Sequence, residues 1–180
     1  MDTTERTEPA VGTEEARTAW AAAAREILVT TAGTYRDLIT FKQIAAAVQE
    51  NTGITTTQLS NHWLGDVLSR VAVECDQRGE PLLTSLCVDA TGSVGANYSA
   101  TVARIRGTAP DDGDMQAAEE RLACHRFFGA DVPEGGGTRA LSTQEKTRRD
   151  RAKKAAPYDG KTCAKCNMEL PANGACDYCD

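Results

Sequence analysis

The stretch "TFKQIAAAVQENTGITTTQLSNHWLGDVLSRVAVECDQRG", residues 40–79, decides the predicted fold. A Thr-x-x-Gln capping box at Thr40 opens one helix, an apolar stripe follows, and Gly53 ends it. A second capping box of the same type at Thr55 opens a longer amphipathic helix that ends at Gly79. The stretch therefore predicts two helices that meet across a tight turn.

The flanking segments extend this pattern. Residues 14–29 have helical apolar spacing with two acids in the first turn, and another helix is expected to begin at about Asp114. Residues 81–90 form a strand-like run, and residues 96–105 alternate and are rich in strand-favouring side chains, so a β-hairpin is expected between them. Two helices followed by a hairpin predict a winged helix-turn-helix over residues 40–106.

The predicted fold class is α+β: a mainly helical, winged-helix-like domain with a β-hairpin, and a small C-terminal four-cysteine zinc ribbon. With only 5% aromatic residues, the core has few large side chains. We expect these to be Trp20, Trp63, Phe127 and Phe128. The predicted organisation is a disordered tail (1–12), the helical domain (13–130), a loop and basic helical linker (131–160) and the ribbon (161–180).

Four of the seven cysteines lie near the C-terminus with the spacing C-x2-C-x9-C-x2-C; they are Cys163, Cys166, Cys176 and Cys179. Two close pairs of thiolates suit one tetrahedral ion, and their softness favours Zn2+ over hard cations. The alternatives are iron, redox-active thiols or disulfides. A ribbon this small buries too little apolar surface to fold alone, so the metal would supply its folding free energy. The remaining cysteines, Cys75, Cys87 and Cys124, lie in apolar patterns and are expected to be buried and inert.

Charge is distributed unevenly along the chain. Residues 1–130 contain 11 Lys and Arg against 18 Asp and Glu, whereas residues 139–165 contain 9 against 3. A compact basic stretch can bind phosphates even in a chain with a net charge of -6, and polar side chains at the start of the second helix can hydrogen-bond base edges. The predicted nucleic-acid contacts are Thr57, Gln58, Asn61, His62, Arg104, Arg106, Lys146, Arg148, Arg149, Arg151, Lys153 and Lys154.

Three resemblances accompany these patterns. The terminal "CAKCNMELPANGACDYC" resembles zinc ribbons of nucleic-acid-associated and adaptor proteins. The segments "YRDLITFKQIAAAV", "LLTSLCVDATGSVGANY" and "AAEERLACHRFFGADVP" resemble an uncharacterised family of small actinobacterial and actinophage proteins. The layout is also similar to the winged-helix part of alkylguanine alkyltransferase-like proteins, but their Pro-Cys-His-Arg motif is missing, so the resemblance implies no alkyl transfer.

These observations favour a non-enzymatic, zinc-containing nucleic-acid-binding protein, with DNA the expected partner and RNA a second one. The alternative is a protein-binding adaptor or inhibitor that acts through the winged-helix surface or the ribbon. A third hypothesis, a nuclease or transferase using Cys124, His125 and nearby acids, is weaker because neighbours in a helix point about 100° apart. The N-terminus has no apolar leader and no membrane span is visible, so we expect a cytoplasmic protein.

Overall fold

A computed structural model describes residues 14–155, 162–168, 170, 176 and 179. The chain divides into two compact units, Met1–Lys146 and Thr147–Asp180. The predicted disordered tail and most of the residues between the two cysteine pairs of the predicted ribbon lie outside the described residues.

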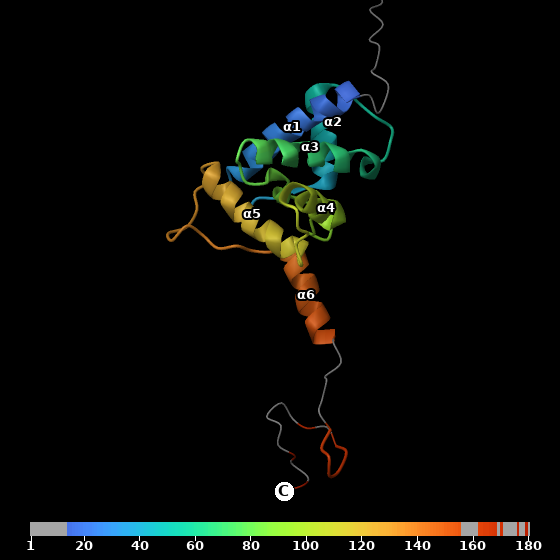
Figure 1. Ribbon diagram of the computed structural model, residues 1–180, viewed down its shortest axis with the longest axis vertical. Coiled ribbons are helices and arrows are strands. Elements are labelled where there is room, and N and C mark those ends of the chain that lie inside the picture. The colour runs from blue at the N-terminus through green and yellow to red at the C-terminus, as the bar shows by residue number, and fades with distance from the viewer. Residues whose placement is uncertain (1–13, 156–161, 169, 171–175, 177–178, 180) are drawn as a thin grey trace, which may run out of the picture. The chain divides into compact units, whose positions relative to one another are not determined.

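Three helices form the centre of the first unit: α1 (Glu14–Ala32), α2 (Phe41–Thr52) and α3 (Leu64–Gln77). α1 packs against both α2 and α3 (Figure 1). The indoles of Trp20 and Trp63 stack in this core with their ring centroids 4.5 Å apart, and both side chains are buried. The Trp20 indole also donates a hydrogen bond to the Ile54 carbonyl (3.1 Å), which ties the segment after α2 to α1.

The first predicted capping box is confirmed and the second is wrong. Thr40 and Gln43 cap each other's backbone at the start of α2, and Gly53 ends the helix with a left-handed φ of 68°. The segment after Gly53 is irregular: a short 3-10 helix, η1 (Ser60–His62), precedes α3. The Thr56 hydroxyl accepts the Gln58 amide two residues on, so it closes a local turn instead of helping to cap a helix.

The predicted β-hairpin is also wrong. Residues 81–106 contain a 3-10 helix, η2 (Leu83–Leu86), a short strand, β2 (Cys87–Val88), and the helix α4 (Gly95–Arg106). β2 pairs in parallel with β1 (Ile39–Thr40), which lies before α2. Tyr98 and Val102 are buried one turn apart in α4, so helical packing overrides the strand propensity of this stretch. Without a hairpin wing, the winged-helix identity is not confirmed.

Two further helices follow: α5 (Gly113–Phe127) and α6 (Thr143–Ala155). The Asp112 carboxylate caps α5 by accepting the amides of residues 114 and 115, close to the predicted start. Phe128 packs against the core, but Phe127 is 57% exposed, so its assignment to the core was wrong. Among the described residues, no helix has the length and apolarity needed to cross a membrane.

Candidate functional site

A groove of about 400 Å³ lies between η1 with the start of α3 on one side and α4 on the other. Its lining residues are Asn61, His62, Gly65, Asp66, Ser69, Asn97, Ala100, Thr101 and Arg104. Three of the predicted nucleic-acid contacts, Asn61, His62 and Arg104, therefore meet in one concave surface, although Arg104 lies in α4, far along the chain from the adjacent Asn61 and His62 of η1. All three side chains are exposed.

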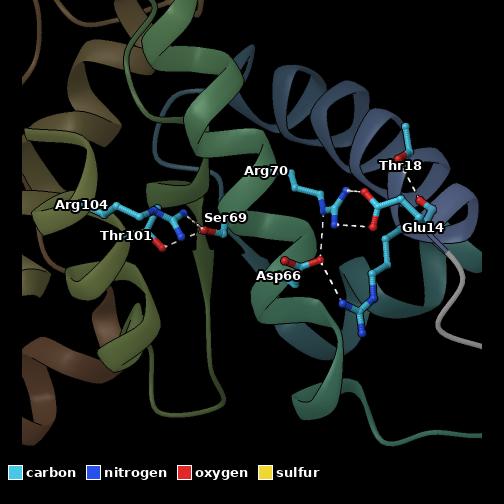
Figure 2. A network of polar contacts seen from close by, with 8 residues as sticks. Glu14, Thr18, Asp66, Ser69, Arg70, Thr101 and Arg104 are labelled. Carbon is cyan, nitrogen blue, oxygen red and sulfur yellow. Dashed lines mark hydrogen bonds and ion pairs between the residues drawn. The ribbon is translucent and has the colours of Figure 1, made fainter.

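The α4 side of the groove carries its free positive charge. The Arg104 guanidinium donates to the Ser69 hydroxyl, which is also hydrogen-bonded to Thr101 (3.2 Å), as Figure 2 shows. Within the part of the chain that the structure describes, Arg104 forms no ion pair. Its charge is therefore available to an incoming anion, while the Ser69 contact fixes the direction of the side chain.

Among the described residues, one acid, Asp66, lines the groove, and arginines compensate its charge. Asp66 accepts from Arg70 (2.9 Å) and pairs with Arg17 (3.4 Å), and Arg70 also binds Glu14 on the side of α3 that faces α1 (Figure 2). The pKa of Glu14 is lowered because its carboxylate accepts a hydrogen bond from Arg70. Asp66 therefore contributes less negative potential to the groove than an unpaired carboxylate would.

Three other predicted contacts lie outside the groove lining. Thr57 and Gln58 are exposed on the irregular segment that precedes η1. Arg106 is the last residue of α4 and forms an ion pair with Glu120 of α5. Its charge is therefore partly neutralised within the unit, which the hairpin prediction did not anticipate.

A pocket of about 280 Å³ shares part of its wall with the groove. We call it the Thr84 pocket. Its lining residues are Phe41, Ser60, Asn61, Leu64, Gly65, Leu68, Ser69, Thr84, Val94, Gly95, Ala96, Asn97, Tyr98 and Thr101, none of them charged. The Thr84 side chain is only 5% exposed, and its hydroxyl has no hydrogen-bond partner among the described residues. An engineered cavity of about 150 Å³ binds benzene, which has six non-hydrogen atoms. By the same ratio of volume to atoms, the Thr84 pocket has room for an uncharged group of about ten non-hydrogen atoms.

Sequence reasoning missed Thr84 because residues 81–90 were interpreted as a strand. Nothing in the local sequence distinguishes this threonine from those with partners. A run of buried residues, Leu83 to Val88, surrounds it and indicates burial, but not the unpaired hydroxyl.

The predicted basic cluster lies in α6. Lys146 ends the first unit, and the other five cations belong to the second. All six side chains are exposed except that of Arg149, which is partly buried. α6 has almost no apolar residues, as expected for a charged helix rather than a core element.

The four tail cysteines, Cys163, Cys166, Cys176 and Cys179, come together as their spacing predicts. Their Sγ atoms all lie within 4.8 Å of one another, and the Sγ atoms of Cys166 and Cys176 are 3.5 Å apart. Thiolates bound to one zinc ion at about 2.3 Å lie roughly 3.8 Å apart at tetrahedral angles, so only small shifts would let all four share an ion. The cluster can therefore hold a metal ion.

The backbone around Cys163 favours a thiolate. Asn167 adopts the left-handed conformation (φ 56°), and its amide donates to the Cys163 carbonyl (2.9 Å). Amides of Lys165 and Cys166 donate to the Cys163 thiol and lower its pKa to about 6. The neighbouring thiols, Cys166 first, raise the pKa of Cys179 to about 12. The Cys163 thiol therefore loses its proton readily, whereas the Cys179 thiol keeps its proton. A bound divalent cation would favour the thiolate form of Cys179 as well.

The other cysteines and the second histidine have structural positions. Cys75, Cys87 and Cys124 are buried, as predicted, and burial raises the pKa of Cys124 to about 12. The Arg36 amide donates to His125 Nε2 (3.1 Å), so Nδ1 carries the proton and donates to the Ala32 carbonyl (2.9 Å). Because both imidazole nitrogens hold backbone groups, His125 is not placed to activate the neighbouring thiol.

Comparison with known proteins adds no relative: no family model, curated protein or solved structure matches the chain.

Proposed function

We propose that this protein is a non-enzymatic nucleic-acid-binding protein, with DNA as its main ligand, RNA as a second one, and a structural zinc ion in its tail. The observation that carries the proposal is the meeting of Asn61, His62 and Arg104 around one groove. An amide and an imidazole can hydrogen-bond base edges, and an arginine without an ion-pair partner among the described residues can bind a phosphate. The resemblance to actinobacterial and actinophage proteins suggests a regulatory or accessory factor of phage or mobile-element biology.

The basic residues of α6 supply the second part of the proposal. Arg151, Lys153 and Lys154 are exposed and follow one another within a single turn. Such a cluster neutralises phosphates without regard to base sequence and releases condensed counterions. The groove would then provide preference among sequences, while α6 provides affinity.

Zinc is proposed as the metal of the tail. Four thiolates form a soft donor set that leaves no open position on a tetrahedral ion, which is typical of structural zinc sites. When bound, zinc would hold the two cysteine pairs together and supply folding free energy to the tail. The ion takes part in no reaction in this proposal.

The test is a salt titration of binding to a short fluorescent duplex of random sequence, followed by anisotropy. A variant with Arg151→Ala, Lys153→Ala and Lys154→Ala loses three phosphate contacts. We expect the slope of log Kd against log salt concentration to become shallower by about 2.7, since each contact adds about 0.9. Affinity should fall most at low salt. Repeating the titration with an RNA duplex ranks the two ligands.

The matched control removes the same charge elsewhere, with Lys42→Ala, Arg78→Ala and Arg139→Ala. Arg78 and Arg139 already pair with Glu74 and Glu119, so their loss should leave the slope nearly unchanged. Equal slopes for the two triple variants would show that binding follows net charge alone. Asn61→Ala should change the preference among duplexes without changing the slope. No measurable binding of any duplex or RNA would overturn the proposal.

An adaptor or inhibitor that binds another protein is the second candidate. It is favoured by exposed apolar side chains on the acidic unit: Leu59 is 69% exposed and lies just before η1, and Phe127 is 57% exposed. Large exposed apolar side chains are enriched where proteins bind one another. Absence of duplex binding, together with one co-purifying protein that is lost on Leu59→Ala, would support this candidate.

A further inference from the structure

A second cavity in the Met1–Lys146 unit shares no lining residue with the groove or the Thr84 pocket. It has a volume of about 160 Å³ and is formed by the loop after α1, one face of α5, the segment before α6 and the first residues of α6. We call it the Arg121 pocket. Its lining includes Tyr35, Arg36, Arg121, His125, Thr138 and Gln144.

Arg121 is a buried cation whose hydrogen bonds are incomplete. The side chain is 5% exposed, its Nε donates to the Ser85 carbonyl (2.6 Å), and its Nη2 has no partner among the described residues. Burial lowers the pKa of Arg121, whereas the charge of Asp114 acts in the opposite direction. The hydrogen bonds given for the Asp114 carboxylate come from the Val94 amide (2.9 Å) and the Ser93 hydroxyl (3.0 Å). A buried ion without a hydrogen-bonded counterion is costly unless a ligand supplies one.

The described lining around this guanidinium carries positive charge. Arg36 is its second cation, and none of the described residues that line the pocket is an Asp or a Glu. Both imidazole nitrogens of His125 are hydrogen-bonded to backbone groups, so its ring lines the pocket without offering a free donor. The first residues of α6 complete the lining, and the start of a helix carries a partial positive charge.

Arg36 is held in place by several contacts. Its backbone is left-handed (φ 65°), an unfavourable conformation for arginine, and its amide is bound by His125. Its guanidinium lies 5.3 Å from the centre of the Tyr35 ring and donates to the Thr138 hydroxyl (3.3 Å). Both donors in the pocket are therefore oriented before any ligand arrives, which lowers the entropy cost of binding.

We propose that the Arg121 pocket binds a small oxyanion of the phosphate type, with Arg121 and Arg36 as its charged ligands. A volume of about 160 Å³ admits an anion of this size with one or two waters, since a water occupies about 30 Å³ of liquid. Guanidinium groups match the geometry of phosphate oxygens through paired hydrogen bonds. This proposal does not depend on nucleic-acid binding, because the pocket shares no residue with the groove.

The first experiment measures thermal unfolding of the full chain in rising inorganic phosphate, with chloride adjusted to constant ionic strength. A ligand that binds the folded state raises the midpoint with a logarithmic dependence on its concentration. We expect this rise in phosphate and sulfate, but none in chloride alone. Nuclear magnetic resonance of the arginine side chains should show the Arg121 Nε–Hε signal moving in a saturable way. A midpoint that follows ionic strength only, with no movement of that signal, would overturn the proposal.

Variants then assign the effect to the pocket. Arg121→Gln removes the charge while keeping a donor for the Ser85 carbonyl, and it should abolish the phosphate dependence. Arg36→Ala changes an exposed side chain and should weaken phosphate binding about tenfold without unfolding the protein. Arg78→Ala, which removes an exposed arginine outside the pocket, should leave the phosphate affinity unchanged. If Arg121→Gln fails to fold, an unchanged phosphate affinity in Arg36→Ala is sufficient to reject the proposal.

The phosphate could belong to a free anion or to a nucleic-acid backbone. Competition separates these sources: a short duplex added to phosphate-saturated protein either displaces phosphate from the Arg121 signal or leaves it bound. Displacement that is lost in Arg36→Ala would identify the backbone as the source, and retention would identify the free anion. Both outcomes require saturable phosphate binding in the pocket and are consistent with the proposal. Absence of saturable phosphate binding rejects the proposal.

Discussion

The unpaired hydroxyl of Thr84 supports a quantitative test of the packing around η2. Thr84→Val replaces the hydroxyl by a methyl group of nearly the same size, so the shape of the pocket wall is kept. The native side chain is 5% exposed and its Oγ1 has no partner among the described residues. An unsatisfied buried polar group costs roughly 1–3 kcal/mol, so removing it should stabilise the fold by about 1–2 kcal/mol.

Thr31 provides a matched control in the same unit. Its side chain is 8% exposed, but its hydroxyl donates to the Ile27 carbonyl one turn earlier in α1 (3.0 Å). Thr31→Val makes the same chemical change and loses a satisfied hydrogen bond, worth about 1 kcal/mol or less here because the carbonyl keeps its helical partner. The same substitution should therefore have opposite signs at the two positions.

Urea unfolding followed by tryptophan fluorescence measures both variants, because Trp20 and Trp63 lie in the core of this unit. In thermal unfolding the stabilised variant should melt about 2–8 °C higher, at about 2–4 °C per kcal/mol for a chain of this size. If Thr84→Val is destabilised as much as Thr31→Val, the Thr84 hydroxyl has a partner and the reasoning fails.

Three further outcomes are expected. Gly92→Ala should lose about 2–4 kcal/mol of stability in urea unfolding, because Gly92 has a φ of 84° and a Cβ there would collide with the Ser142 hydroxyl. Gly53→Ala is the control: Gly53 has a similar φ of 68° but open space around it, so this variant should lose only about 1 kcal/mol. His125→Ala should cost about 2–4 kcal/mol and speed hydrogen exchange at the Arg36 amide, while exposed His62→Ala should change stability by less than about 0.5 kcal/mol. At pH 8, a thiol reagent should modify the four tail cysteines rapidly only after a chelator is added. It should modify Cys75, Cys87 and Cys124 only on unfolding, because burial raises the pKa of these three thiols. Rapid labelling of all seven cysteines in the folded protein would contradict this assignment.

The helices that the sequence predicted correctly are those with local signals. α2 has a capping box at Thr40 and a glycine at its end, and α1 has two acids, Glu14 and Glu15, in its first turn. These interactions join residues a few positions apart, so the chain needs no tertiary contact to specify them. The same is true of the cysteine cluster, because two C-x2-C pairs can bind one ion wherever the rest of the chain lies.

The errors occurred where packing opposes local preference. Residues 96–105 contain β-branched and alternating side chains, but Tyr98 and Val102 are buried on one face of α4, so packing selects a helix. The Thr55 box does not form, because the Gln58 amide that it would have used donates to the Thr56 hydroxyl, and the Thr56 amide donates to the Gln49 side chain of α2. Phe127 was assigned to the core by its type, although the end of α5 places only Phe128 against the core.

Residue types alone indicated Asn61, His62 and Arg104 as candidate contacts, but only the fold places them around one groove. Arg121 and Thr84 could not be found from sequence, because a missing partner is a property of what surrounds a side chain. The sequence by itself determined the start of α2, the burial of Cys75, Cys87 and Cys124, and the four-thiol cluster, all of which follow from spacings or apolar patterns within short stretches. The tertiary structure alone decided the helix at residues 95–106, the groove and both pockets, because burial and hydrogen bonding between distant segments outweigh the small free energies of local propensity.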